Sequence, residues 1–344
     1  PSDRFLSFVA TVLPPLGEAR VVQTTFDRLL GPATDARSDD RWLPILDRFE
    51  DTLVDPGPLR VGYRTVPADE VAALVDRLRG RPLPWRERRR VFVARIAERT
   101  GARASEVTAA ATALWPPLTT AAAMARLRRP EVLSGLGAPD DLVAAWCGRR
   151  SGRRAPVDGP LLDEVRARIE GPPARYSHVI VDEAQDASLL QLRAVLRRAD
   201  GLTLVGDDAQ RSNPAGLGLR RAAALLDVEL AEMTTAYRMS AEIADWLNRH
   251  AATHGIDAVT LVGIRPTGTP VRELDGRSTP HQALEAELRG RWANVARIGA
   301  DDVWDHKGVE YDAVVVDTTA MGPAEIYLAA SRAAHELVVL SPTP

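Results

Sequence analysis

The second half of the chain alternates short apolar runs with amphipathic helical patterns, and this alternation limits the fold more than any other feature. The apolar runs predict strands at 176–181, 202–205, 271–274, 296–298, 313–317 and 337–340, and helices are expected at 189–198, 219–226, 239–250 and 324–334. Strands that alternate with helices indicate an α/β fold, with a parallel sheet that carries helices on both faces. Such sheets bind ligands at the carboxyl ends of their strands. Polar residues that directly follow these strands are therefore the first candidates for a functional site.

The first half of the chain has a different pattern. Residues 1–30 predict a helix, which Pro14-Pro15 ends, and then a strand at 21–26. From 31 to 170, Ala-, Leu- and Arg-rich helical patterns are interrupted by Gly and Pro, which indicates a mainly helical region. Its clearest helix, 85–99, carries an arginine flank, which is either a solvated face or a contact for an acidic partner or a phosphate backbone. We expect the tryptophans to be core residues rather than base-stacking platforms; they are Trp42, Trp85, Trp115 and Trp146.

Composition excludes several classes of protein. A net charge of -3 and a pI near 6.2 exclude a globally basic nucleic-acid binder, although a local basic groove stays open. One cysteine, Cys147, excludes an internal disulfide framework and a multi-cysteine metal site. No apolar run reaches the roughly 18 residues that a membrane span needs, and the N-terminus lacks the pattern of a secretory signal. We therefore expect a cytoplasmic protein.

Lysine is almost absent. Lys307 is the single lysine among 44 Lys and Arg residues. A phosphate-binding P-loop, GxxxxGK[ST], needs its lysine between a glycine and a hydroxyl residue. Lys307 lies instead in the order His-Lys-Gly, so these 344 residues contain no P-loop.

Two adjacent carboxylates follow the expected strand 176–181. Asp182 and Glu183 open the sequence Asp-Glu-Ala-Gln-Asp. Two like charges at the end of a buried strand raise each other's cost of ionisation, and a divalent cation removes that cost. The pattern is that of a Walker B motif, in which Asp182 would hold Mg²⁺ and Glu183 would activate water for attack on a γ-phosphate.

The next expected strand, 202–205, ends in Gly-Asp-Asp-Ala-Gln. Gly206 permits a tight backbone turn beside a ligand. Gln210 can orient a water molecule or sense a phosphate oxygen. Because this motif follows the carboxylate pair by about twenty residues, the two together are typical of one phosphate site.

Three further motifs contain candidate residues. In Thr-Thr-Ala-Tyr-Arg, Tyr237 can stack on a base and Arg238 can hold a phosphate. The sequence HKGVEYD, residues 306–312, precedes the strongly apolar strand 313–317. In YLAASRA, Arg332 either reaches a γ-phosphate as an arginine finger or is a buried structural arginine.

The order of these five motifs resembles that of the superfamily-1 helicases of the UvrD/Rep type. DEAQD is similar to their motif II, VGDDAQ to motif III, TTAYR to motif IV, HKGVEYDAVVV to motif V and YLAASRA to motif VI. The resemblance covers residues 176–344. It implies two RecA-like domains, each a parallel sheet flanked by helices, that close on ATP and Mg²⁺ and hydrolyse the nucleotide.

Matched motif by motif, the resemblance implies a role for each candidate residue. Asp182 would hold the metal and Glu183 would be the general base. Gln210 would sense the γ-phosphate, which Arg238 and Arg332 would clamp. The remaining residues would lie at the nucleotide, Tyr237 on the adenine, Glu310 at the ribose or the motor-domain interface, and Gly206, Asp207 and Gly308 beside them.

Within this group the chain most resembles HelD, the RNA polymerase-associated ATPase of Gram-positive bacteria. Residues 1–30 resemble the HelD stretch after the P-loop helix, and ERRRVFVARIAE, ALWPPLT and DGPLLDEVRARIEG resemble its helical insertion. The resemblance implies that 1–30 and 171–232 are parts of the first motor domain and that 233–344 is the second. It implies that 31–170 is the insertion that pushes on the polymerase clamp. It implies a protein that binds RNA polymerase core and releases it from nucleic acid, with direct nucleic-acid binding and oligomeric state left open.

The chain departs from the family in several ways. It lacks the P-loop and the N-terminal coiled coil, its motif VI reads AASRA where ALTRA is usual, and its second motor domain is short. We expect a fragment or a truncated paralogue with negligible ATPase activity on its own. There are two alternative hypotheses. The chain is a fragment of a UvrD-type DNA repair helicase, or it is a non-catalytic interaction protein derived from a helicase.

Overall fold

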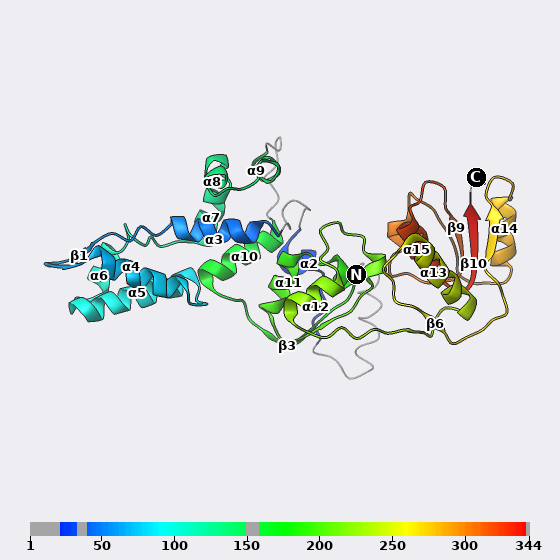
Figure 1. Ribbon diagram of the computed structural model, residues 1–344, viewed down its shortest axis with the longest axis horizontal. Helices are drawn as coiled ribbons and strands as arrows, with labels where there is room; N and C mark the ends of the chain where they lie inside the picture. The colour runs from blue at the N-terminus through cyan, green and yellow to red at the C-terminus, as the bar shows by residue number, and fades with distance from the viewer. Residues whose placement is uncertain (1–20, 33–39, 149–157, 342–344) are drawn as a thin grey trace. The chain divides into compact units, whose positions relative to one another are not determined.

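The computed structural model describes residues 21–32, 40–148 and 158–341 (Figure 1). They form two compact units. The helical unit consists of Thr24–Val179 and Ser188–Thr203, and the sheet unit consists of Ile180–Ala187 and Leu204–Pro344 with the described residues before Thr24. The helix expected within 1–13 lies outside the described residues.

Helices make up most of the helical unit, as the sequence predicts for 31–170. They are α2 (Phe26–Leu30), α3 (Trp42–Thr52), α4 (Ala68–Arg79), α5 (Trp85–Thr100), α6 (Ala104–Ala110), α7 (Thr120–Leu127), α8 (Pro130–Gly135), α9 (Asp140–Cys147), α10 (Gly159–Glu170) and α11 (Leu189–Leu196). Helix α5 matches the expected helix 85–99. It begins after Pro84 and ends where Gly101 takes a left-handed φ of 65°.

One continuous apolar core fills the helical unit and contains all four tryptophans expected there. Trp42, Trp85 and Trp115 are at most 1% exposed, and Trp146 is 8% exposed. Trp42 packs edge-on against Trp146, and Trp85 packs edge-on against Trp115. The prediction that these residues are core residues is confirmed.

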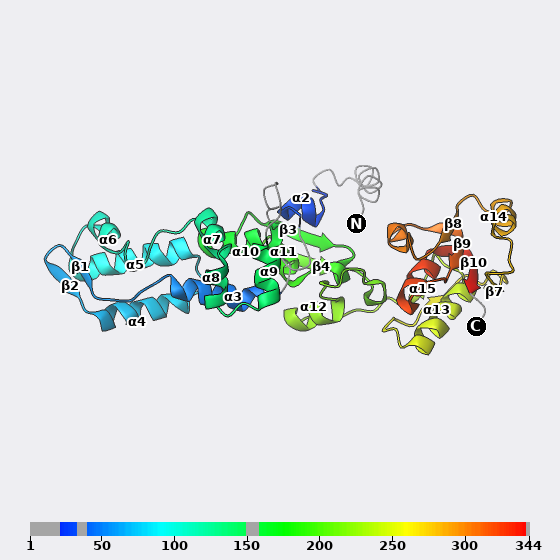
Figure 2. The same ribbon diagram turned by 90° about the horizontal axis from the view of Figure 1, so that it is seen from above.

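A short hairpin that the sequence did not predict lies at one end of the helical unit. Strands β1 (Leu59–Val61) and β2 (Arg64–Val66) pair antiparallel. Leu59, Val61 and Val66 are buried in the unit's core. Within the unit, the hairpin and α11 lie at opposite ends in both views (Figures 1 and 2).

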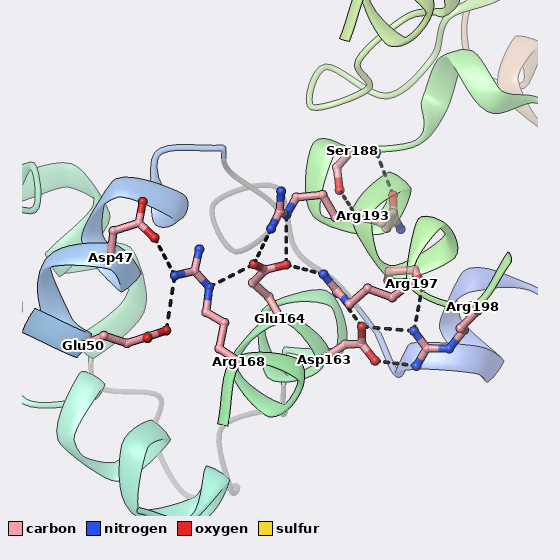
Figure 3. Close-up of polar contacts among 11 residues, drawn as sticks. Asp47, Glu50, Asp163, Glu164, Arg168, Ser188, Arg193, Arg197 and Arg198 are labelled. Carbon is pink, nitrogen blue, oxygen red and sulfur yellow. Dashed lines mark hydrogen bonds and ion pairs between the residues drawn. The ribbon is translucent and has the colours of Figure 1, made fainter. Parts of the chain in front are cut away.

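Buried carboxylates of α10 fix α11 in place (Figure 3). Glu164 is 1% exposed and accepts hydrogen bonds from Arg193 of α11 and from Arg197, which directly follows the helix. Its neighbour Asp163 accepts from Arg197 and Arg198. A buried ion pair adds little net stability compared with an apolar pair, but it fixes how two elements are aligned. The network therefore determines the register of α11 against α10.

Helix α11 connects strands β3 (Tyr176–Val181) and β4 (Ala199–Leu204), which pair in a two-stranded sheet. Its start is defined by a capping box, in which the Ser188 hydroxyl accepts from the Gln191 amide and the Gln191 side chain accepts from the Ser188 amide. Both strands match their predicted positions to within a few residues. Each strand continues into one of the motif loops of the sheet unit.

The sheet unit contains a four-stranded sheet in the order β7 (Arg272–Asp275), β10 (Ala333–Ser341), β9 (Tyr311–Asp317), β8 (Val295–Ile298). All its neighbouring strands are parallel. A second sheet pairs β5 (Thr235–Ala236) with β6 (Val262–Gly263), also in parallel. The unit's helices are α12 (Leu219–Leu226), α13 (Ala241–His254), α14 (His281–Arg289) and α15 (Pro323–Ala330).

Successive residues of β9 enter different cores, because side chains alternate across a strand. Val314 and Val316 pack with residues of α13 and α15, whereas Ala313 and Val315 pack with Leu284 and Leu288 of α14. Both faces of the sheet are thus covered by helices. The predicted α/β class, with parallel sheets flanked by helices and a mainly helical insertion, is confirmed.

The strand predicted at 21–26 is wrong. Val21 and Val22 are exposed and irregular, and Phe26 begins helix α2. The Thr25 hydroxyl accepts a hydrogen bond from the Arg28 amide and caps this helix. A β-branched run therefore ends in a helix here, because a local cap outweighs strand propensity.

Candidate functional site

The carboxylate pair predicted at the end of β3 lies in a short, constrained loop, residues 182–186, here called the acidic loop. Glu183 takes a left-handed φ of 54°, and a 3-10 turn, η2 (Ala184–Asp186), follows it. The Glu183 amide donates to Asp182 Oδ1 over 2.9 Å. Glu183 Oε2 accepts from Gln185 Nε2 over 2.7 Å. A non-glycine residue in this backbone region is uncommon and is often found at functional sites.

Gln185 connects the acidic loop to the second motif, residues 205–210, here called the glutamine loop. Its side chain is fully buried, and its Oε1 accepts from the Asp207 amide over 3.1 Å. A Cβ atom at Gly206 would lie only 2.0 Å from Gln185 Oε1. Gly206 therefore allows the close approach of the Gln185 side chain, whereas the sequence predicted a ligand beside it.

Asp207 organises the glutamine loop. Its Oδ1 accepts from the Ala209 amide over 3.0 Å, and its Oδ2 accepts from Gln210 Nε2 over 2.8 Å. Burial raises the pKa of the Asp207 carboxyl, against the opposing effect of these hydrogen bonds. The Gln210 amide group is thereby oriented so that its oxygen remains available to another donor.

That donor is Arg332, at the end of α15. Its guanidinium donates to Gln210 Oε1 over 2.6 Å and to Ser331 Oγ over 2.9 Å. Arg332 is 8% exposed, and no carboxylate of the described residues lies within ion-pair distance of it. Burial lowers the pKa of Arg332, and the more distant charges of Glu183 and Asp207 oppose this effect. A buried cation held only by neutral acceptors is poised for an anion.

Lys307, the single lysine, reaches both loops. It follows η4 (Val303–His306), and its Nζ lies 2.5 Å from Asp186 Oδ2, 2.8 Å from the Gln210 carbonyl oxygen and 3.4 Å from Glu183 Oε2. Burial alone would raise the pKa of Asp186, but hydrogen bonds from Lys307, the Asn213 amide and Ser212 hold that pKa below its ordinary value. The segment 306–312 is thus bonded to the acidic loop and the glutamine loop.

Lys307, Gln185 and Asp186 were not predicted as site residues. Each lies inside a motif that the sequence singled out, and a lone lysine in an arginine-rich chain was a usable signal for Lys307. Gln185 gave no such signal, because only the fold shows that its side chain is buried between two loops.

Four predicted residues lie apart from these contacts. Tyr237 is 66% exposed. The Arg238 side chain is also exposed, and its guanidinium pairs with the Glu310 carboxylate. Gly308 takes a left-handed φ of 77° directly after Lys307. The structure therefore brings Asp207, Gln210 and Arg332 together, and Lys307 joins Glu183 to the glutamine loop. Arg238 and Glu310 form an exposed ion pair, although the charge of Arg238 still acts on Arg332.

A divalent cation would find few protein ligands here. Within residues 21–32, 40–148 and 158–341, no group of three or more His, Cys, Asp or Glu side chains could hold a metal ion. Mg²⁺ is commonly bound through one or two carboxylates, with phosphate and water as its other ligands. The donor set of Asp182 and Glu183 fits that mode of binding.

Comparisons with known proteins give only partial likenesses. No protein family matches the chain, and no curated protein matches it. The PRRSV helicase structure has 16% sequence identity and a TM-score of 0.36, over 62% of this chain and 44% of that one. Arterivirus nonstructural protein 10 (helicase) in a complex with DNA has 17% identity and a TM-score of 0.36, over 51% and 42%. The chain thus spans less than half the length of these helicases.

Among the described residues, no helix is both long and apolar enough to cross a bilayer.

Proposed function

We propose that the sheet unit is the phosphate-sensing part of a superfamily-1 helicase-type ATPase motor. The observation that carries this proposal is the contact between Gln210 and Arg332, whose buried guanidinium bonds, among the described residues, to neutral oxygens only. An arginine in such a place costs free energy unless an anion joins it. The γ-phosphate of a nucleoside triphosphate would be that anion, with Gln210 reporting its presence.

The acidic loop would supply the other half of the chemistry. Asp182 would hold Mg²⁺, which when bound neutralises charge on the phosphates. Glu183 would accept the proton of the attacking water, because the hydrogen bond from Gln185 fixes its carboxylate. Tyr237 would bind the adenine, and Arg238 would join the phosphate clamp after leaving Glu310.

These residues lack the cradle that a P-loop supplies, namely a lysine and a row of backbone N–H groups. The chain's single lysine, Lys307, is hydrogen-bonded to Asp186. We therefore expect weak MgATP binding and a turnover well below about 1 s⁻¹, the low end of ordinary enzyme rates.

Fluorescent-ATP titration tests the phosphate-sensing role. We expect Arg332→Ala and Gln210→Ala to weaken MgATP binding about tenfold, and Arg95→Ala, on the exposed surface of α5, to have no effect. Binding that is equal in wild type and Arg332→Ala refutes the role of this arginine. A turnover near 1 s⁻¹ for the wild-type chain would contradict the expected inactivity.

We further propose that the motor is of the HelD kind and acts on RNA polymerase core. The support is the motif order together with the helical unit, which has its own core and of which Thr24–Val179 precedes motif II in the chain. Between Arg41 and Gly148 it contains 17 arginines and 13 carboxylates, so it has a positive charge although the whole chain is at -3. This charge suits an acidic partner surface.

Co-elution with purified core RNA polymerase tests the partner, with a single-stranded DNA shift measured beside it over a salt series. Polymerase binding with little DNA affinity is the expected result. DNA binding that falls steeply with salt, without polymerase binding, would favour the repair helicase instead. Binding to neither would overturn the assignment to HelD.

A further inference from the structure

The hairpin of the helical unit presents an unusual side chain at its turn. Gly62 and Tyr63 connect β1 to β2, and Gly62 takes the left-handed φ of 58° that the turn requires. Tyr63 is fully exposed, at 103% of its reference surface. Two-residue hairpin turns favour Asn, Asp and Gly, and an exposed aromatic ring there gains nothing from packing. The folding of the hairpin therefore does not explain Tyr63.

The base of the hairpin is anchored in the core of the helical unit. Leu59, Val61 and Val66 are at most 4% exposed and belong to the unit's core. The Arg64 guanidinium donates to the Thr100 carbonyl oxygen at the end of α5. A side chain presented on a fixed support loses little conformational freedom when it binds, so its contact area contributes more to affinity.

Charge at the turn is of one sign. Arg60 and Arg64 are the charged residues between Leu59 and Val66, and both are exposed. Arg60 Nε donates to the Gly62 carbonyl oxygen over 3.3 Å, which leaves its NH groups free to meet an acceptor. Tyrosine and arginine are the residue types that dominate binding energy at protein interfaces.

These features favour a protein over a nucleic acid as the partner. Sequence-independent binding of single strands uses successive aromatic platforms along a basic groove. Here a single aromatic side chain, Tyr63, lies between Leu59 and Val66, so the hairpin offers no row of stacking platforms. A single ring with a cationic rim fits an apolar pocket edged by carboxylates on a protein surface.

We propose that Tyr63 is the anchor residue of a docking tip, residues Arg60–Arg64, that inserts into such a pocket on the protein partner. This inference rests on the proposed function, in which the partner is RNA polymerase core. It adds which residues of the helical unit make the decisive contact and what chemistry they meet. Within the helical unit, the hairpin lies at the end away from α11 (Figures 1 and 2).

Affinity for purified core RNA polymerase, measured by biolayer interferometry, tests the docking tip. We expect Tyr63→Ala and Arg60→Glu each to weaken binding about tenfold or more, and Tyr63→Phe to keep most of it, because the ring supplies the contact. Arg95→Ala, which removes an exposed arginine that pairs with Glu98, is the matched control and should bind like wild type. Unchanged thermal midpoints establish that the variants fold.

Each other outcome has a distinct meaning. Wild type and Tyr63→Ala that bind polymerase equally well overturn the docking tip and leave the proposed function standing. A wild-type chain that does not bind polymerase overturns both. Loss of single-stranded DNA binding by Tyr63→Ala, with polymerase binding intact, would make the tip a base-stacking element and also overturns the proposal.

Discussion

Neutralising Glu164 tests the buried network that positions α11. Glu164→Gln keeps the size of the side chain but removes the charge that Arg168, Arg193 and Arg197 share. Breaking a buried ion pair from one side typically costs about 3–5 kcal/mol, because the partner charges stay buried without compensation. We expect a loss of unfolding free energy in that range at pH 7.

The pH dependence of the unfolding free energy gives an independent estimate of how much Glu164 contributes to stability. Burial would raise the pKa of Glu164, but the hydrogen bond from Arg193 and the charges of Arg197, Arg193 and Arg168 lower it from 4.5 to about 2. Because the folded-state pKa is depressed, the stability it contributes is present above about pH 4.5 and is lost as the pH falls towards 2. A shift of this size corresponds to about 3 kcal/mol, of which about 2 kcal/mol disappears between pH 5 and pH 3.

Urea unfolding of wild type and Glu164→Gln between pH 3 and pH 7 measures both quantities. Other carboxylates titrate in both proteins, so the difference between the two isolates Glu164. The stability gap should be about 3 kcal/mol or more at pH 7 and should narrow as the pH falls from 5 to 3. Glu98→Gln, whose partner Arg95 is exposed, should change stability by less than about 0.5 kcal/mol. A gap that does not change with pH would refute the reasoning.

Two further predictions concern packing. Gly206→Ala places a methyl group 2.0 Å from Gln185 Oε1 and should lower the unfolding free energy, measured with urea, by about 1–3 kcal/mol. Amide exchange at residues 182–186 and 205–210 should become faster. Unchanged exchange there would contradict the close contact. Trp42→Ala removes a fully buried ring from its edge contact with Trp146 and should cost about 3–5 kcal/mol, whereas a loss below about 1 kcal/mol would show that the core of the helical unit does not depend on it.

Much of the local structure could be predicted from the sequence. The strands 176–181 and 313–317 and the helices 85–99 and 219–226 follow from apolar period, proline breaks and helix stops, which act over a few residues. The prediction of a strand at 21–26 was wrong because Thr25 caps a helix that the β-branched pattern did not indicate. The hairpin at 59–66 was missed because its strands are only three residues long, too short for a period to be recognised.

Part of the candidate site could also be predicted from the sequence. The motifs contain the residue types that phosphate chemistry needs, so Asp182, Glu183, Gln210 and Arg332 could be named from the sequence. The sequence could not show that Gln185 is buried between the two loops or that Lys307 bonds to Asp186, 121 residues away. Such contacts depend on which strand ends meet, and that is decided by sheet order.

The sequence by itself determined the α/β class, the absence of a P-loop and the identity of the candidate phosphate-site residues, because periodicity, composition and motif spacing are properties of the chain. Only the tertiary structure decided that Arg332 is buried without a carboxylate partner in the described part of the chain, that Arg238 pairs with Glu310, and that Tyr63 is fully exposed. Burial and ion pairing depend on which distant segments pack together, and a residue's neighbours in space are not its neighbours in sequence.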